Sequence, residues 1–263
     1  MLTVGSLFSG IGGFDLGLER AGMKVIWQSE IDPFATKVLK KHWPEVPNYG
    51  DIKRINWGDI VSPDVICGGY PCQPFSTAGK RRGEEDPRHL WPWVLESISR
   101  LRPKYAILEN VRGHLSMGGV SVVGELANIG YRSEWRVISA ASVGANHRRD
   151  RVLIVAYPDS SPGKLSLEQQ VQESDSYGHG SDLANAYSKR LVEISSEVFS
   201  AERRESALAG LTLGSWWQSE PNVGRMADGV PGRVDRLRTL GNAVVPQVAE
   251  VVGRLVMSHA SST

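Results

Sequence analysis

Short apolar runs alternate with longer amphipathic stretches over the first 157 residues of the chain. Runs of strand length predict strands, and apolar residues at helical spacing predict helices. The predicted strands are 3–8, 24–28, 65–67, 105–108, 135–139 and 152–156. The predicted helices are 14–21, 33–41, 90–101, 120–128 and, near the end of the chain, 247–257. Repeated strand–helix–strand units with apolar strands predict an α/β fold, a mostly parallel sheet flanked by helices.

Residues 159–222 break this pattern. Serine, glycine and acidic residues dominate the first part of the segment, which holds five Lys or Arg and ten Asp or Glu. Its net charge is therefore −5, and the rest of the chain carries +6. We expect a cofactor-binding and catalytic domain over 1–158, a small irregular region over 159–222, and a segment over 223–263 that returns to the catalytic domain.

The basic residues outside that segment gather in three clusters, at 80–82, 147–151 and 233–238. Clusters of this kind are often solvated faces, but three of them around one site favour a polyanionic partner. The two cysteines lie five positions apart and have no paired histidines, which argues against a disulfide framework and a structural zinc site. With no apolar run of membrane-spanning length and no signal peptide, we expect a cytoplasmic protein without metal or membrane contact.

Cys72 follows the predicted strand 65–67 at a turn made by Gly68, Gly69 and Pro71. A thiol on a tight turn past the end of a strand is typical of a nucleophile. The alternative is a buried structural cysteine, which is our interpretation of Cys67 within the strand.

A glycine-rich turn over 8–13 follows the first predicted strand and opens a helix, so its backbone can approach a ligand closely. Glu30 ends the next strand about 20 residues later, where a carboxylate can bind the two hydroxyls of a ribose. The glycine spacing differs from that of dinucleotide-binding loops, which favours a nucleoside without pyrophosphate over a nicotinamide cofactor. Asp51 can accept a hydrogen bond from an adenine amino group, or it is simply a turn aspartate.

Glu109 ends an apolar strand, where partial desolvation would raise its pKa and make it a proton donor near neutral pH. The alternative is a glutamate that caps a helix. His147, Arg149 and Arg151 alternate, so an extended backbone would point them to one face suited to an anion. A solvated strand edge is the alternative for these three residues.

In these motifs the chain resembles the cytosine-5 DNA methyltransferases of bacteria and their phages. Residues 8–13 resemble the cofactor loop of that family, 69–76 its nucleophile motif and 109–111 its proton-donor motif. Arg149 and Arg151 match the arginines of its Gln-x-Arg-x-Arg motif, with His147 where glutamine is usual. Residues 241–246 are similar to its last motif, which completes the cofactor pocket. The five matches occur in order over nearly the whole chain outside 159–222.

The resemblance implies a Rossmann-like, S-adenosylmethionine-dependent methyltransferase in which 159–222 form the target-recognition region. It implies methylation of carbon 5 of a flipped-out cytosine in double-stranded DNA through a covalent adduct of Cys72 with carbon 6. Glu109 would donate to N3 of the base, Arg149 and Arg151 would hold its carbonyl or lower the thiol pKa, and Gln73 would join the catalytic group. The cofactor-binding residues implied are Phe8, Ser9, Gly10, Gly12, Gly13, Glu30, Ile31, Asp51, Pro71, Leu90, Asn242 and Ala243.

The expected partner is double-stranded DNA, and the expected location is the cytoplasm, in association with the nucleoid or with phage DNA. We expect a monomer, with a cognate restriction endonuclease as a candidate partner. A tRNA cytosine-5 methyltransferase of the same superfamily is the first alternative, and an inactive DNA-binding homologue is the second.

Overall fold

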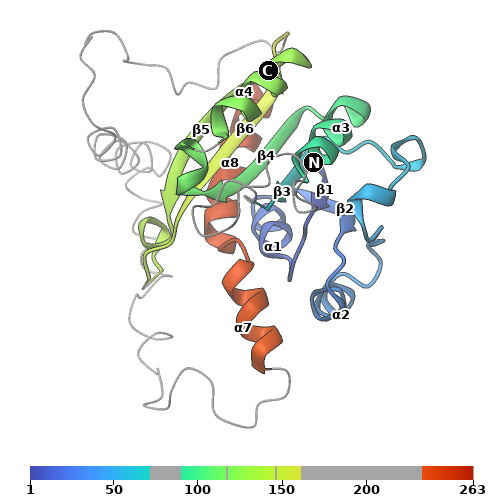
Figure 1. Ribbon diagram of the computed structural model, residues 1–263, viewed down its shortest axis with the longest axis vertical. Helices are drawn as coiled ribbons and strands as arrows, with labels where there is room; N and C mark the ends of the chain where they lie inside the picture. The colour runs from blue at the N-terminus through green and yellow to red at the C-terminus, as the bar shows by residue number, and fades with distance from the viewer. Residues whose placement is uncertain (72–89, 117, 146, 161–232, 263) are drawn as a thin grey trace, which may run out of the picture.

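The computed structural model describes residues 1–71, 90–116, 118–145, 147–160 and 233–262 (Figure 1). Six strands form one sheet in the order β2-β1-β3-β4-β6-β5. They are β1 (Thr3–Leu7), β2 (Lys24–Ser29), β3 (Val65–Gly69), β4 (Tyr105–Val111), β5 (Tyr131–Ser139) and β6 (Asp150–Pro158). The pairs from β2 to β4 are parallel, and β6 runs antiparallel to both of its neighbours. The predicted mostly parallel α/β sheet is therefore confirmed.

Six helices accompany the sheet in the described part of the chain. They are α1 (Gly13–Arg20), α2 (Pro33–His42), α3 (Trp91–Leu101), α4 (Gly119–Asn128), α7 (Arg233–Asn242) and α8 (Pro246–Ser262). Asp32 caps α2, since its carboxylate accepts from the backbone N–H groups of Phe34 and Ala35. None of the described helices is long and apolar enough to cross a membrane. Within 159–222, only 159 and 160 belong to the described residues, so the predicted recognition region lies almost entirely outside them.

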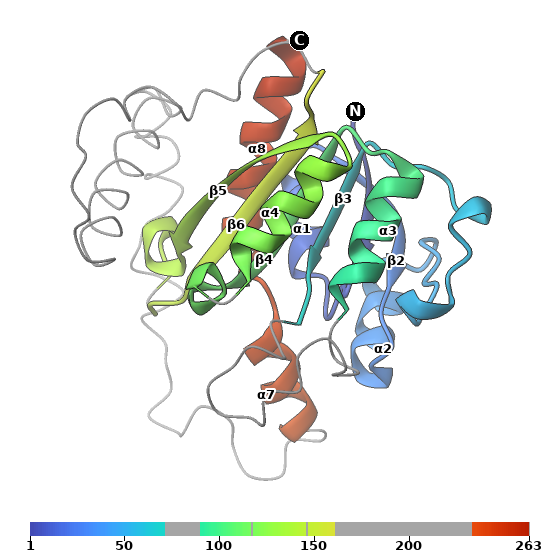
Figure 2. The same ribbon diagram turned by 45° about the horizontal axis from the view of Figure 1, so that its top comes forward.

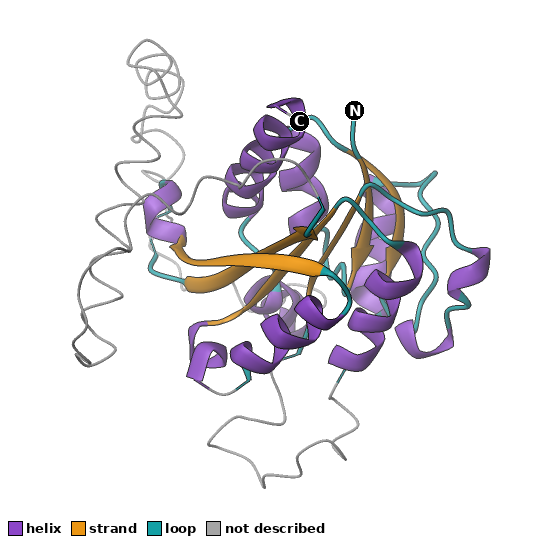
Figure 3. Ribbon diagram, turned by 90° about the horizontal axis from the view of Figure 1, so that it is seen from above, coloured by secondary structure: helices purple, strands orange, loops and turns teal. Residues whose placement is uncertain are grey.

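Alternate side chains of the central strands point into two separate cores. Ile66, Leu108 and Ile154 belong to the core covered by α3 and α4. Their neighbours Cys67, Ile107 and Leu153 belong to the core covered by α1 and α8. The strands thus form a twisted layer with helices on both faces (Figures 2 and 3). Cys67 is fully buried, which confirms its interpretation as a core residue.

Two glycines set the close contact between α1 and α8. A Cβ atom added at Gly17 would lie 2.3 Å from the carbonyl oxygen of Pro246 and 2.5 Å from Ala249 Cβ. A Cβ at Gly253 would lie 2.7 Å from Ala21 Cβ. Because α1 begins directly after the glycine turn, this packing fixes the C-terminal segment beside the turn.

Candidate functional site

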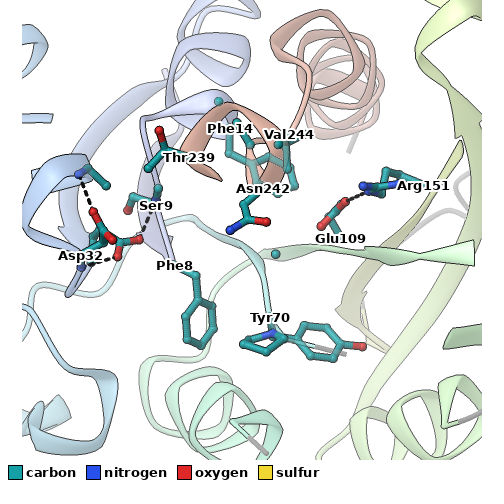
Figure 4. A pocket seen from close by; sticks show the side chains of 18 of the residues that line it. Phe8, Ser9, Phe14, Asp32, Tyr70, Glu109, Arg151, Thr239, Asn242 and Val244 are labelled. Atoms are coloured by element: carbon teal, nitrogen blue, oxygen red, sulfur yellow. Dashed lines mark hydrogen bonds and ion pairs between the residues drawn. The ribbon is translucent and has the colours of Figure 1, made fainter. Parts of the chain in front are cut away.

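A cavity of about 480 Å³ lies beyond the carboxyl ends of β1 to β4, where open α/β sheets bind their ligands. The loops after these strands supply one wall, and the end of α7 with the following loop supplies another (Figure 4). In Figure 4, Asn242 projects into the space between Ser9 and Glu109. The cavity volume falls within the range of about 300–1,000 Å³ that is usual for small-molecule sites.

The glycine turn adopts an unusual backbone conformation. Gly10 and Gly12 have positive φ angles of 56° and 86°, which favour glycine because it lacks a Cβ. Phe8 also has a positive φ of 51°, and such strain in a non-glycine residue clusters at functional sites. The turn therefore brings backbone close to the cavity between β1 and α1, together with the side chains of Phe8 and Ser9 (Figure 4).

Glu30 is held in place by backbone donors. Its carboxylate accepts from the N–H of Gly10 at 2.8 Å, of Ile31 at 2.9 Å and of Asp32 at 2.7 Å. A carboxylate offers about four acceptor sites, so one remains for a ligand hydroxyl. The backbone of Glu30 is fixed in turn by Asn48, whose carboxamide accepts from Glu30 N at 2.9 Å and donates to Glu30 O at 3.1 Å.

Glu109 and Arg151 meet because β6 runs antiparallel to β4. Glu109 pairs with Leu153, and Arg151 pairs with Val111, which makes Glu109 and Arg151 diagonal neighbours on one face of the sheet. Arg151 Nε lies 2.7 Å from Glu109 Oε1 (Figure 4). Burial raises the pKa of Glu109, while Arg151 and Arg149 oppose the rise. This buried carboxyl therefore takes up a proton more readily than an exposed glutamate does.

Arg149 directly precedes β6 and also lines the cavity. Its Nη2 donates to the carbonyl oxygens of Gly241 at 2.6 Å and Ala243 at 3.0 Å, on either side of Asn242. The arginine thus ties the start of β6 to the end of α7 and the residue that follows it. His147 lies apart from this pair and lines a neighbouring cavity of about 400 Å³ that Arg149 shares.

The cavity brings together most of the site residues predicted from the sequence. These are Phe8, Ser9, Gly10, Gly13, Glu30, Pro71, Glu109, Arg149, Arg151, Asn242 and Ala243.

Four predicted cofactor residues do not line this cavity. Gly12 faces the neighbouring one, and Ile31 is 69% exposed. Asp51 caps the short turn Ile52–Arg54 by accepting from the N–H of Lys53, and Leu90 stands at the start of α3. Cys72 and Gln73 lie outside the described residues.

Several cavity residues were not predicted from the sequence. Arg238 and Thr239 line it from α7, and Arg238 Nη2 lies 2.6 Å from Asp32 Oδ2. Tyr70 and Asn110 line it from the ends of β3 and β4. These four residues lie inside or beside the motifs matched at 69–76, 109–111 and 241–246, and this position in the sequence was the signal that could have identified them. No cluster of three or more His, Cys, Asp or Glu side chains suited to a metal occurs among the described residues.

Comparison with known families gives one match over most of the chain. The family model for C-5 cytosine-specific DNA methylases matches residues 2–213. Among curated proteins, the chain is 38% identical over 164 residues to the Type II methyltransferase M.BsuFI of Bacillus subtilis, covering 60% of this chain and 40% of that protein. It is 38% identical over 161 residues to M.NgoBI of Neisseria gonorrhoeae, covering 59% and 50%. The chain thus spans half or less of the length of these relatives.

Solved structures agree on the fold. A putative DNA modification methyltransferase from an Escherichia coli prophage is 28% identical with a TM-score of 0.52, over 61% of this chain and 47% of that one. A Dnmt2 of Spodoptera frugiperda is 22% identical with a TM-score of 0.53, over 67% and 54%. The second likeness concerns the fold alone.

Proposed function

Because the chain belongs to the C-5 cytosine-specific DNA methylase family, we propose that it transfers a methyl group from S-adenosylmethionine to carbon 5 of cytosine in double-stranded DNA. One observation carries the proposal. A single cavity places the glycine turn and Glu30 on one side and the buried Glu109–Arg151 pair on the other. The glycine turn and Glu30 suit a nucleoside, and the Glu109–Arg151 pair suits proton donation to a base.

The cavity residues fit the proposed cofactor. The free acceptor site of Glu30 suits a ribose hydroxyl, and the positive φ angles at Gly10 and Gly12 leave backbone open to close approach. S-adenosylmethionine, when bound, supplies an electrophilic methyl group on a sulfonium sulfur.

The remaining chemistry is assigned to side chains of the chain. In the proposed reaction the thiolate of Cys72 forms a bond to carbon 6 of the cytosine, and the ring electrons move toward N3. Glu109 donates a proton to N3, so that no full negative charge builds up on the ring. Carbon 5 thereby becomes nucleophilic and accepts the methyl group. Carbon 5 then loses its proton to water, the bond between carbon 6 and sulfur breaks to release the Cys72 thiolate, and N3 returns its proton to Glu109, which restores the aromatic ring.

Arg151 has a positioning role in this scheme. Its ion pair at 2.7 Å fixes the direction of the Glu109 carboxyl, while burial keeps the pKa of that carboxyl raised. The cytosine must leave the duplex to reach such a buried group, which costs a few kcal/mol.

We further propose a DNA-modification role of the Type II kind, because the relatives above are named Type II methyltransferases.

Sequencing for 5-methylcytosine in DNA from a host that expresses the chain tests the proposal. We expect one short recurrent sequence to carry 5-methylcytosine, and we expect Cys72→Ala to abolish it. Cys67→Ala is the matched control, because Cys67 is buried in the strand and should leave the modification in place. Absence of the modification from DNA, or its appearance in tRNA instead, would contradict the proposal.

A further inference from the structure

We propose that the hydrogen bond between Tyr70 and His114 positions the end of β3 relative to Glu109, and that His114 is thus a positioning residue for methyl transfer. The inference rests on the proposed function, because it assigns His114 a part in the same reaction. His114 lies outside every motif on which the sequence analysis relied, in the turn Arg112–Ser116 that follows β4.

The regular pairing of β3 with β4 stops just before this point. Its last register pair is Gly69 with Glu109, so Tyr70 and Pro71 lie beyond the strand ladder. Pro71 has no backbone N–H to donate. Other contacts must therefore fix the direction in which the chain leaves β3 toward Cys72.

Two side chains that follow Glu109 supply such contacts. Asn110 Nδ2 donates to the carbonyl oxygen of Tyr70 at 3.2 Å. The hydroxyl of Tyr70 lies 2.7 Å from His114 Nε2, and the two rings meet edge to face with centroids 5.5 Å apart. Tyr70 and His114 are each only 4% exposed. Residue 70 is thus held at its backbone and at its hydroxyl by the segment that carries the predicted proton donor.

His114 makes this contact at a cost. Its Nδ1 is buried and has no hydrogen-bond partner among the described residues. Burial also lowers the pKa of the imidazole, which keeps the ring neutral. A leucine or phenylalanine would fill the same space without an unpaired nitrogen, so the polar ring is better explained by its hydrogen bond to Tyr70 than by packing alone.

The chain contains a matched pair for comparison. Tyr105 Oη lies 2.7 Å from His259 Nδ1, and these rings also meet edge to face, with centroids 5.8 Å apart. Tyr105 is the first residue of β4, whereas Glu109 lies near the end of the strand. Removal of the Tyr105 hydroxyl therefore deletes a tyrosine–histidine hydrogen bond at the opposite end of β4, away from the cavity.

The test compares Tyr70→Phe with Tyr105→Phe in the full chain. Methyl transfer is followed with labelled S-adenosylmethionine and amplified, unmethylated bacterial genomic DNA, which presents all short sequences. We expect Tyr70→Phe to lower kcat about tenfold, since displacements below 1 Å at reacting groups have effects of this order. KM for S-adenosylmethionine should stay within about twofold of wild type. Tyr105→Phe should change kcat less than about twofold, although both variants lose one tyrosine–histidine hydrogen bond.

His114→Gln and His114→Ala add a rescue test. Glutamine keeps an acceptor for the Tyr70 hydroxyl, so it should retain more of kcat than alanine does. Equal kcat losses in Tyr70→Phe and Tyr105→Phe, or no difference between the two His114 variants, would overturn the inference.

A second readout does not depend on methyl transfer. Iodoacetamide alkylates accessible thiols, and Cys67 is fully buried, with a pKa raised by burial, so modification reports on Cys72. Tyr70→Phe should change the rate of Cys72 alkylation, whereas Tyr105→Phe should not. If the wild-type chain fails to methylate DNA, the proposed function fails. The alkylation rates then still decide the positioning claim, because equal rates in the two variants refute it.

Discussion

Gly69→Ala is the substitution for which the structure predicts a large loss of activity and little change in folding stability. A Cβ built at Gly69 lies 2.7 Å from Glu109 Oε2, whereas ordinary contacts begin at 3.4 Å. The carboxylate must therefore retreat by about 0.7 Å, because β3 and β4 are held in register by their ladder. That movement strains the 2.7 Å contact between Glu109 and Arg151.

The expected loss of activity follows from that displacement. A misplacement near 1 Å at a catalytic group costs up to about 100-fold, so we expect kcat to fall about 10- to 100-fold, or about 1.4–2.7 kcal/mol in activation free energy. Folding stability should change little. Gly69 has no positive φ that excludes alanine, and alanine in a strand offsets part of the steric cost by about 0.5–1 kcal/mol.

Steady-state methylation kinetics and urea unfolding measure the two effects on the same preparations. Gly124→Ala in α4 is the matched control, since a Cβ there meets nothing within 4 Å. It should keep full activity. A Gly69→Ala variant with wild-type kcat would refute the reasoning. A kcat loss that is fully accounted for by the unfolded fraction of the protein would also refute the reasoning.

Three further predictions concern other parts of the structure. The pKa of fully buried Asp15 is raised from 3.8 to about 6. The contribution of Asp15 to stability is therefore complete below about pH 4 and is lost as pH rises through about 6. The expected change in the free energy of unfolding is about 3 kcal/mol. Urea titrations at several pH values measure it, and Asp15→Asn should abolish this pH dependence. Gly17→Ala should lower the unfolding free energy by about 1–3 kcal/mol through overpacking against α8, and a stabilised variant would contradict this. Arg238→Ala should weaken S-adenosylmethionine binding at most about fivefold in calorimetric titrations, because its ion pair with Asp32 is partly exposed.

The sheet was predictable because its strands are apolar runs separated by glycine turns. All six predicted strands occur, although all but β1 extend beyond the predicted bounds. The expected turn at Gly68 and Gly69 is wrong, because both residues pair with β4 as the last residues of β3. β5 is one of the two edge strands, and its side chains are largely half-buried, so its first residues show no clear apolar run. Helix α7 was missed for a similar reason. Its sequence is mostly polar, and it contributes Thr239 and Asn242 to the cavity rather than an apolar face to a core.

The candidate site was predictable only where local sequence fixes position. Glu30 follows the end of β2 and Glu109 lies near the end of β4, so parallel strands bring both to one edge of the sheet. The partner of Arg149 was not predictable, because Gly241 and Ala243 lie 92 and 94 residues away in the sequence. The pairing of Tyr70 with His114, 44 residues apart, depends on where β4 ends and the following turn begins. Such contacts depend on the packing of elements, and neither periodicity nor motif spacing encodes them.

The central claim is that Cys72 attacks carbon 6 of a cytosine while Glu109 protonates the base. Duplex DNA that contains 5-fluorocytosine at the methylated position tests this most directly. Fluorine cannot leave carbon 5 as a cation, so the covalent adduct should accumulate in the presence of S-adenosylmethionine. We predict a protein–DNA complex that survives denaturation and whose cross-linked peptide contains Cys72, and we predict its loss in Cys72→Ala and slow formation in Glu109→Gln. Absence of an adduct from an active preparation, or an adduct that persists in Cys72→Ala, would contradict the account.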